Sequence, residues 1–137
     1  MLGRLQFKDA TLRSVSDSCK LVTDRVGSRA WREFHMQVIS AVSEAYNNIV
    51  LHGYEGREDG VIEVNIRTRR DHISVELRDW GSSFDPTAVP VPDFDRLPES
   101  GLGLFIIKAF MKVKYRPGSP NVLILSKSLE DPAEGGA

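Results

Sequence analysis

Two polar side chains lie one helical turn apart in the run SEAYNNIVLHGY, the carboxylate of Glu44 and the carboxamide of Asn48. Side chains four residues apart share one face of a helix, and His52 falls on the same stripe. A carboxylate can act as a general base or orient a water, and an asparagine carbonyl is a hard oxygen ligand that suits Mg²⁺. The pair predicts a base beside a magnesium ligand, although a solvated helix surface explains an isolated pair equally well.

The tripeptide Asp79-Trp80-Gly81 follows a stretch in which apolar and polar residues alternate. An aspartate shortly before a glycine is common in turns, because the carboxylate bonds to nearby backbone and glycine adopts positive φ. In a binding role, the Asp79 carboxylate would accept a hydrogen bond from an exocyclic amine such as that of adenine. Gly81 would then let the base approach the backbone. The residues alone leave both interpretations open.

A Gly-x-Gly element, Gly101-Leu102-Gly103-Leu104, lies between a proline-rich stretch and an apolar run. Backbone N–H groups and the helix dipole favour anions where a glycine-rich turn opens into a helix. The element therefore predicts a phosphate-binding turn, and a tight entry turn without a ligand is the competing interpretation. No third glycine has Rossmann spacing and no Gly-Lys-Ser or Gly-Lys-Thr follows, which argues against both common nucleotide-binding loops.

The remaining residues and the composition exclude several classes of function. His35, His52 and His72 lack metal-ligand spacing, and the single Cys19 falls on an apolar helix face, so neither a zinc site nor a cysteine nucleophile is expected. A net charge of −1 gives no footprint for direct nucleic-acid binding. The sequence has no membrane-spanning apolar run and no signal-peptide pattern, and with one cysteine it predicts a cytoplasmic protein.

The elements that must position these residues follow from the hydrophobic periodicity, which changes from helical to alternating after Gly53. Four prolines between residues 82 and 100 predict a long loop. The predicted elements are a short edge strand at 5–7 and helices from Asp9 or Thr11 to 26, from Ser28 or Ala30 to 52 and over 102–112. The predicted strands are 62–67, 73–78 with Asp79 at its end, 112–116 and 122–126.

This order predicts an α/β (α+β) fold, a two-layer sandwich with helices on one face of a mixed, largely antiparallel sheet. The length of 137 residues suits one domain, which we expect to span residues 1–129. Residues 130–137 contain no apolar side chain larger than alanine, so we expect a disordered tail.

The three fragments, in this order, resemble the GHKL (histidine-kinase-like) ATPase superfamily. Within it they are most similar to bacterial anti-sigma-factor serine/threonine kinases and switch kinases. Residues 41–54 resemble the N-box of that family, residues 79–86 its first glycine box, and residues 101–107 its second. The resemblance extends over residues 9–126 and implies a Bergerat-type ATP-binding fold.

The resemblance also implies a role for each matching position. Asn48 would ligate Mg²⁺ between the phosphates of ATP, and Glu44 would be the general base. Asp79 would bind the adenine amino group with support from Gly81, and residues 84–100 would form a lid. The predicted nucleotide-binding residues are Asn48, Asp79, Gly81, Ser83, Arg96, Gly101, Leu102, Gly103 and Leu104.

This chain departs from the family pattern at three places. Ser83 stands where the first glycine box usually has a second glycine, which would stiffen or narrow the turn beside the nucleotide. Arg96 is the only basic residue of the lid, and the strand at 122–126 lacks the threonine that many relatives carry. Affinity and turnover are therefore expected to differ from those of relatives.

Together these features predict an ATP-dependent protein-serine kinase and anti-sigma factor of a partner-switching module. Its partners would be a sigma factor and a STAS-type anti-anti-sigma antagonist, without direct contact to nucleic acid or membrane. A homodimer and a monomer both occur in such families. A nucleotide-gated binding module without chemistry is the main alternative. A histidine-kinase catalytic fragment would need a separate dimerisation helix pair, for which the chain is too short.

Overall fold

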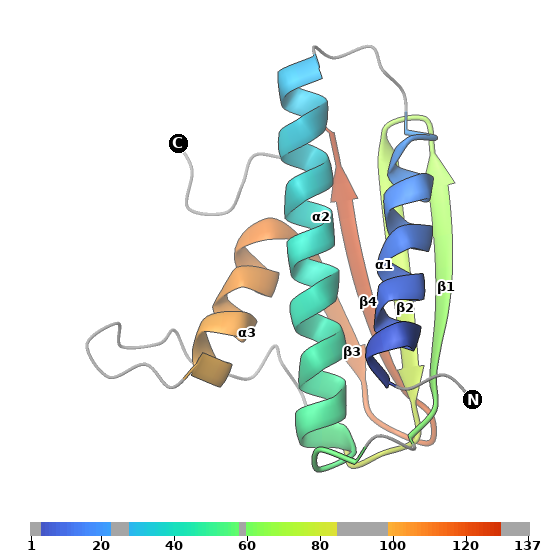
Figure 1. The fold of residues 1–137 in the computed structure, drawn as a ribbon, viewed down its shortest axis with the longest axis vertical. Coiled ribbons are helices and arrows are strands. Elements are labelled where there is room, and N and C mark those ends of the chain that lie inside the picture. The colour runs from blue at the N-terminus through green and yellow to red at the C-terminus, as the bar shows by residue number, and fades with distance from the viewer. Residues whose placement is uncertain (1–3, 23–27, 58–59, 85–98, 130–137) are drawn as a thin grey trace.

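Three helices, one π-turn and four strands make up the part of the chain that the computed structural model describes, residues 4–22, 28–57, 60–84 and 99–129. Two helices come first, then a hairpin, then one helix and a second hairpin (Figure 1). The elements are α1 (Arg4–Cys19), α2 (Ser28–Asn48), the π-turn η1 (Ile49–Gly53), β1 (Ile62–Arg69), β2 (His72–Asp79), α3 (Glu99–Phe110), β3 (Lys112–Arg116) and β4 (Asn121–Ser128).

The four strands form one sheet in the order β1-β2-β4-β3, and every described pairing is antiparallel. The last strand, β4, therefore lies between β2 and the edge strand β3. All three helices cover the same face of this sheet (Figure 1). The predicted two-layer α/β class is confirmed, and the sheet is antiparallel throughout the described strands.

The apolar periodicity of α2 explains why this helix lies across the middle of the sheet. Phe34, Val38, Ala41, Val42 and Ala45 recur at helical intervals and are all buried. Removing a valine or phenylalanine side chain from water stabilises a fold by about 1.5–3 kcal/mol. The inward residues of β2 that line the same core are Ile73, Val75 and Leu77.

The predicted edge strand at residues 5–7 is wrong, because these residues belong to α1. The segment Arg4–Phe7 contains no glycine, proline or β-branched residue, so nothing in it stops a helix from starting early. Close to this end, the Lys8 ammonium donates a hydrogen bond to Oδ1 of Asn47 at 2.8 Å and so links α1 to α2. The described α1 ends at Cys19, and residues 23–26 of the predicted helix lie outside the described residues.

Two further predicted boundaries differ from the structure. Regular α-helix ends at Asn48 rather than His52, and η1 carries the chain on to Gly53. The third helix begins at Glu99, so Gly101 and Gly103 lie inside α3 and not in a turn before it. Helix propensity does not mark the end of the regular α-helix at Asn48, because a π-turn and an α-helical turn accept the same residue types.

Cys19 lies in the core, as its helical position predicts. Burial raises the pKa of its thiol to about 12, so at neutral pH it is not a nucleophile. Among the described helices, none combines the length and the apolar character needed to cross a membrane.

Candidate functional site

The second glycine of the Gly-x-Gly element lies against the helix that carries the predicted base. A Cβ atom placed on Gly103 would be 2.6 Å from Oε2 of Glu44 and 3.8 Å from Nδ2 of Asn48. The shorter distance is too small for a non-bonded contact, so only glycine fits while the Glu44 carboxylate keeps this position. The structure thus brings three predicted site residues together where α2 and α3 pack.

The polar atoms of α2 at this contact lack partners. Asn48 is 9% exposed, and its Nδ2 has no hydrogen-bond partner among the described residues. Glu44 is half-buried and makes no hydrogen bond or ion pair within the same residues. An unsatisfied buried polar group costs about 1–3 kcal/mol, so a ligand that bonds to these atoms here recovers that free energy.

Asp79 ends β2, is 4% exposed and lines the same pocket as Asn48. Its Oδ1 accepts hydrogen bonds from the backbone N–H of Gly81 and from the side-chain amide of Asn121, both at 3.0 Å. No described residue donates to its Oδ2. Oδ2 is not one of the fully buried polar atoms that lack a partner, so it remains accessible and can accept from an amine that enters the pocket.

Asn121, which the sequence analysis did not select, holds the Asp79 carboxylate in place. Its Nδ2 donates to Oδ1 of Asp79 and, at 2.9 Å, to the carbonyl of Gly81. Its Oδ1 accepts from the Ser83 hydroxyl at 2.7 Å and from the Gly118 N–H at 2.9 Å. These four bonds use the whole capacity of a carboxamide and fix its orientation.

A polar residue at an inward strand position is the signal that could have identified Asn121. It shares the buried face of β4 with Leu123 and Leu125, and the strand register places it opposite Asp79. A strand predicted to start at Val122 omits this position by one residue. Ser83 was selected for a different reason, as a substitute for glycine, and the structure shows that its hydroxyl bonds to the Asn121 side chain.

Gly81 is needed where the turn after β2 meets the end of the helical layer. A Cβ on Gly81 would lie 2.2 Å from the backbone oxygen of Gly53. The next residue, Ser82, donates its backbone N–H to that same oxygen at 2.7 Å. Tyr54 continues the contact, since its hydroxyl accepts from the Trp80 N–H at 2.9 Å and donates to the Val61 carbonyl.

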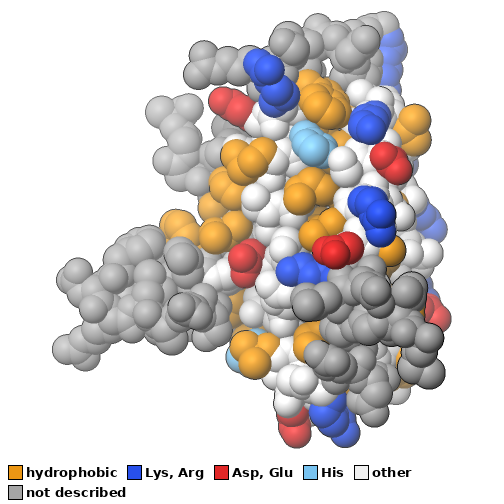
Figure 2. Space-filling model, in the orientation of Figure 1, with side chains coloured by type: hydrophobic (Ala, Val, Ile, Leu, Met, Phe, Trp, Pro, Cys, Tyr) orange, Lys and Arg blue, Asp and Glu red, His pale blue; other side chains and the backbone are white. Residues whose placement is uncertain are grey.

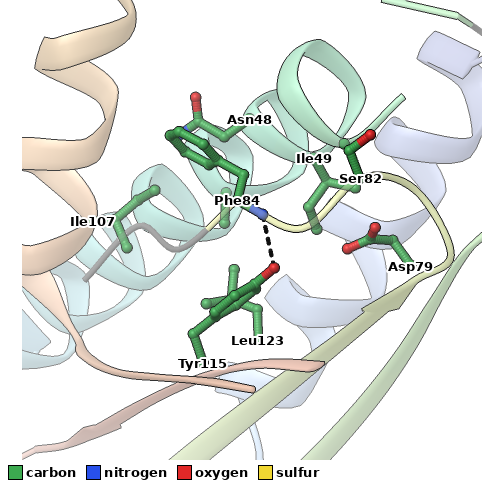
Figure 3. Close-up of a pocket in the computed structure, with 10 residues that line it drawn as sticks. Asn48, Ile49, Asp79, Ser82, Phe84, Ile107, Tyr115 and Leu123 are labelled. Atoms are coloured by element: carbon green, nitrogen blue, oxygen red, sulfur yellow. Dashed lines mark hydrogen bonds between the residues drawn. The ribbon is translucent and has the colours of Figure 1, made fainter. Parts of the chain in front are cut away.

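A pocket lies between Asn48 and Asp79 (Figure 3). Phe84 and Tyr115, neither of which the sequence analysis selected, stand in its middle, and the Phe84 N–H donates to the Tyr115 hydroxyl at 2.9 Å. The space measures about 340 Å³ when the open solvent at its mouth is included, so its enclosed part is much smaller. The lining residues are Ala45, Asn48, Ile49, Gly53, Asp79, Ser82, Phe84, Ile107, Tyr115 and Leu123.

His52 does not extend the stripe formed by Glu44 and Asn48, because the π-turn η1 intervenes. A π-turn adds a residue to the helical repeat and changes the face that the next residues present. The His52 ring instead stacks on Phe84, with ring centroids 4.2 Å apart and an angle of 18° between the planes. Its buried Nε2 has no partner among the described residues.

The other predicted nucleotide-binding residues have more varied positions. Leu104 is 5% exposed and belongs to the hydrophobic core, so it packs between layers. Gly101 and Leu102 lie in the first turns of α3, near the described contact of Gly103 with α2. Arg96 and most of the predicted lid fall within residues 85–98, outside the described residues.

The donor set of the pocket suits a nucleotide better than a metal ion bound by protein alone. Among the described residues, no group of three or more His, Cys, Asp or Glu side chains could hold a metal ion. Mg²⁺ is commonly bound by one or two protein oxygens together with substrate phosphates. The carbonyl oxygen of Asn48 is of the type that Mg²⁺ prefers, and its unpartnered Nδ2 is a donor that fits a phosphate oxygen. The unpartnered Oδ2 of Asp79 fits an amine on a base.

Comparison with known proteins agrees with this geometry. The family model described as the histidine kinase-like ATPase domain matches residues 9–127, nearly the whole described chain. This chain belongs to the histidine kinase-like ATPase family. The resemblance to the GHKL superfamily that the three motifs predicted is confirmed, and with it ATP as the nucleotide that this family uses.

Among individual members of the histidine kinase-like ATPase family, the chain is similar to anti-sigma factors and serine kinases. It is 31% identical over 100 residues to the anti-sigma F factor of Clostridium beijerinckii, covering 66% of this chain and 68% of that protein. It is 38% identical over 100 residues to the serine-protein kinase RsbW of Oceanobacillus iheyensis, covering 66% and 63%. The chain spans about half, 54%, of an anti-sigma F factor from Clostridium botulinum.

The fold itself recurs in a solved structure. A histidine kinase domain from the blue-light activated histidine kinase of Erythrobacter litoralis EL346 superimposes with a TM-score of 0.51 and 16% identity. The match covers 71% of this chain and 45% of the other. At this identity the likeness shows the histidine kinase-like fold and carries no statement about substrate.

Proposed function

We propose that this chain is an ATP-dependent protein-serine kinase that also acts as an anti-sigma factor in a bacterial partner-switching module. It would phosphorylate a serine of a STAS-type antagonist and bind a sigma factor in the cytoplasm. One observation carries the proposal: Glu44 and Asn48 face Gly103 where α2 and α3 pack, and Asp79 presents an unpartnered oxygen in the pocket that Asn48 also lines. The names of two relatives, an anti-sigma factor and a serine-protein kinase, support it.

The side of the pocket formed by the sheet would bind adenine. Asn121 and the Gly81 N–H occupy Oδ1 of Asp79, which leaves Oδ2 to accept the exocyclic amine. Tyr115 and Ile107 line the same pocket and would contact the faces of the base. A charge-assisted hydrogen bond of this kind is worth about 1.5–3 kcal/mol when buried, which would favour adenine over a base without the amine.

The side formed by α2 and α3 would hold the phosphates. Bound Mg²⁺ would neutralise phosphate charge, and Asn48 would ligate it through Oδ1, while its unpartnered Nδ2, a donor, would bond to a phosphate oxygen. Because Gly103 has no side chain, the α3 backbone can approach this side without displacing Glu44. Catalysis would rest mainly on positioning and charge neutralisation, as in other phosphoryl transfers.

Glu44 would act as the general base. It would accept the proton of the antagonist's serine hydroxyl while that oxygen bonds to the γ-phosphorus and the bond to the β-phosphate oxygen breaks, leaving ADP. The Glu44 carboxylate has no hydrogen-bond or ion-pair partner within the described residues, so it is available to a hydroxyl. Proton transfer by a positioned side chain contributes about 10²–10⁴-fold to a rate.

The test is phosphate transfer from γ-labelled ATP to STAS proteins of the same organism, with wild type and Glu44→Ala. We expect Glu44→Ala to lose at least about 10²-fold in transfer rate, while calorimetry finds unchanged affinity for ATP with Mg²⁺. Transfer at the wild-type rate would show that Glu44 is not the base. Failure of the wild type to bind ATP would remove the proposal altogether.

The same experiment separates a kinase from a nucleotide-gated binding module. If ATP promotes binding to a sigma factor or STAS protein and no protein acquires phosphate, the module is the better description. Light scattering of the wild type, alone and with each nucleotide, decides between a homodimer and a monomer.

A further inference from the structure

The pocket between Asn48 and Asp79 holds one of the protein's own side chains. The phenyl ring of Phe84 stands in its middle (Figure 3). Sites for small molecules usually enclose most of the surface of the ligand, whereas the enclosed part of this pocket is small. A nucleobase can therefore be enclosed only if a lining side chain moves, and Phe84 is the one in its way.

Two contacts hold Phe84 in the pocket. Its ring stacks on the His52 ring of η1, with centroids 4.2 Å apart and 18° between the planes. Its backbone N–H donates to the hydroxyl of Tyr115 on the edge strand β3 at 2.9 Å. Phe84 is half-buried, whereas Ser82 and Ser83 just before it are exposed. Phe84 therefore connects the helical layer to the sheet across the pocket.

The stack also leaves a polar atom unsatisfied. Nε2 of His52 is buried and has no hydrogen-bond partner among the described residues, and the phenyl ring that covers the imidazole offers it none. Such an atom destabilises the arrangement that buries it, by an amount similar to what an aromatic stack and a neutral hydrogen bond contribute. The position of Phe84 inside the pocket is therefore only weakly favoured over a position outside it.

A nucleobase and the phenyl ring need the same place. Both are flat and apolar on their faces, and bases of every kind stack on aromatic rings. In the proposed function the base lies beside Asp79 and against the apolar lining of the pocket, where the ring of Phe84 stands. We infer that Phe84 is an internal competitor of the nucleobase: its ring occupies the base site of the free chain and leaves it when a nucleotide binds. This step rests on the proposed function.

The competition predicts the direction in which a substitution changes affinity. A ligand that binds only the open form, with Phe84 outside the pocket, has an apparent dissociation constant equal to its intrinsic one divided by the open fraction. Minor conformations are typically populated at about 0.1–10%, and a weakly favoured closed form places the open fraction near the upper end. Removing the ring should therefore strengthen nucleotide binding about tenfold. A ring that formed a wall of the site would do the opposite, because its removal would take contacts away from the base.

The test compares Phe84→Ala with Phe7→Ala, which removes a phenylalanine ring of α1 that does not line the pocket. The surface of the helical layer mixes charged side chains of both signs with hydrophobic ones (Figure 2), so losing one exposed ring there should leave the site unchanged. Calorimetry measures the binding of ATP with Mg²⁺, of adenosine, and of tripolyphosphate with Mg²⁺. We expect Phe84→Ala to bind ATP and adenosine about tenfold more tightly, and tripolyphosphate, which has no base, like wild type. Phe7→Ala should match wild type for all three.

A second variant loosens Phe84 without removing its ring. Tyr115→Phe keeps the aromatic ring that lines the pocket and removes the hydroxyl that accepts from the Phe84 N–H. Because it removes one of the two contacts that hold Phe84, it should strengthen the binding of ATP and adenosine by a smaller factor, about threefold.

The histidine ring signals in NMR spectra report the position of Phe84 directly. Adenosine should shift the signals of His52 in wild type, because the stacked phenyl ring leaves its face. In Phe84→Ala the His52 signals should differ from those of wild type before any ligand is added. His35 is the internal control, since its ring stacks on Trp31, with centroids 5.1 Å apart, where α1 and α2 meet. Its signals should stay unchanged in both experiments.

Weaker binding of ATP and adenosine by Phe84→Ala overturns the inference, because the ring then forms part of the base site. Unchanged affinity overturns it too, as does an equal gain for tripolyphosphate or a His52 signal that does not respond to adenosine. In each of these cases ATP still binds and the proposed function stands. If neither wild type nor Phe84→Ala binds ATP or adenosine, the proposed function is contradicted, and this inference with it.

Discussion

The two sides of the pocket differ in how their polar atoms are satisfied. On the sheet side, Asn121 makes four hydrogen bonds and fixes both the Asp79 carboxylate and the turn at Gly81. On the helix side, Nδ2 of Asn48 has no described partner, and the Glu44 carboxylate lies against Gly103 without a hydrogen-bond partner among the described residues. One side is organised before any ligand arrives, and the other has polar atoms that remain to be satisfied.

This difference assigns the two sides different tasks. A prearranged hydrogen-bond network loses little entropy on binding, so it suits recognition of a rigid base. Unpartnered polar atoms stabilise a group that brings its own charge, such as phosphate with Mg²⁺. If the assignment is right, substitutions on the helix side alter turnover, and substitutions on the sheet side alter the choice of base.

The largest effect should come from Gly103→Ala, which alters the helix side. The new methyl group would lie 2.6 Å from Oε2 of Glu44 and push the carboxylate away. A displacement of about 1 Å in a catalytic group can cost about 10²-fold, so we expect a loss of that order in kcat for transfer to the antagonist. Stability should not fall, because the displaced atom ends a flexible side chain and alanine favours a helix over glycine by up to about 1 kcal/mol.

Combining Gly103→Ala with Glu44→Gln provides the control. If the alanine acts by moving the carboxylate, it adds little loss once that carboxylate is absent, whereas independent effects multiply. A lower melting temperature for Gly103→Ala together with an unchanged kcat would contradict the assignment of turnover to the helix side, since the glycine would then serve packing alone.

The elements around this pocket were predictable where periodicity is strong. The buried face of α2 and the alternation of β1 and β2 follow from local sequence, so their residues and the end of β2 at Asp79 were predicted correctly. The early start of α1 and of α3 was missed, because helix ends depend on capping and packing rather than on an apolar repeat.

The site itself was predictable only in part. Motif order identified Glu44, Asn48 and Gly103, and the structure brings them together. Asn121 depends on its pairing with Asp79, 42 residues away, which no local pattern encodes. Phe84 and Tyr115 meet for a similar long-range reason, so aromatic residues in the pocket could not be read from the motifs.

The second-largest effect should come from Asn121→Ala, which removes the hydrogen-bond network of the sheet side. Oδ1 of Asp79 would keep only the Gly81 N–H, and the carboxylate would lose its fixed orientation. We expect about tenfold weaker binding of ATP, corresponding to about 1.4 kcal/mol, with a much smaller change for inosine triphosphate, which lacks the exocyclic amine. Calorimetry with both nucleotides, below the melting temperature of the variant, measures this.

The ratio of the two affinities distinguishes a positioning role from a purely structural one. General loosening of the fold would weaken both nucleotides alike and leave the ratio unchanged. In a cycle with Asp79→Ala, the two substitutions should be clearly less than additive, because Asn121 is expected to act through that carboxylate. An unchanged ATP-to-inosine ratio in Asn121→Ala would refute the recognition role of the sheet side.

The smallest effect should come from Ser83→Ala, which tests how much the outermost hydrogen bond of the sheet side contributes to nucleotide binding. Its hydroxyl donates to Oδ1 of Asn121 at 2.7 Å, two bonds removed from the carboxylate that would contact the base. The Gly118 N–H still donates to the same oxygen, so Asn121 stays in place. ATP affinity should therefore fall by no more than about threefold, consistent with a neutral hydrogen bond worth about 0.5–1.5 kcal/mol.

Ser83→Gly restores the residue of the family pattern and separates two possible roles of Ser83. If the hydroxyl matters, Ser83→Gly should lower ATP affinity as much as Ser83→Ala does. If the stiffness of the turn matters, Ser83→Gly should raise kcat. Parallel measurement of ATP affinity and kcat for the two variants separates these causes, and a loss as large as that of Asn121→Ala would place Ser83 in direct contact with the nucleotide.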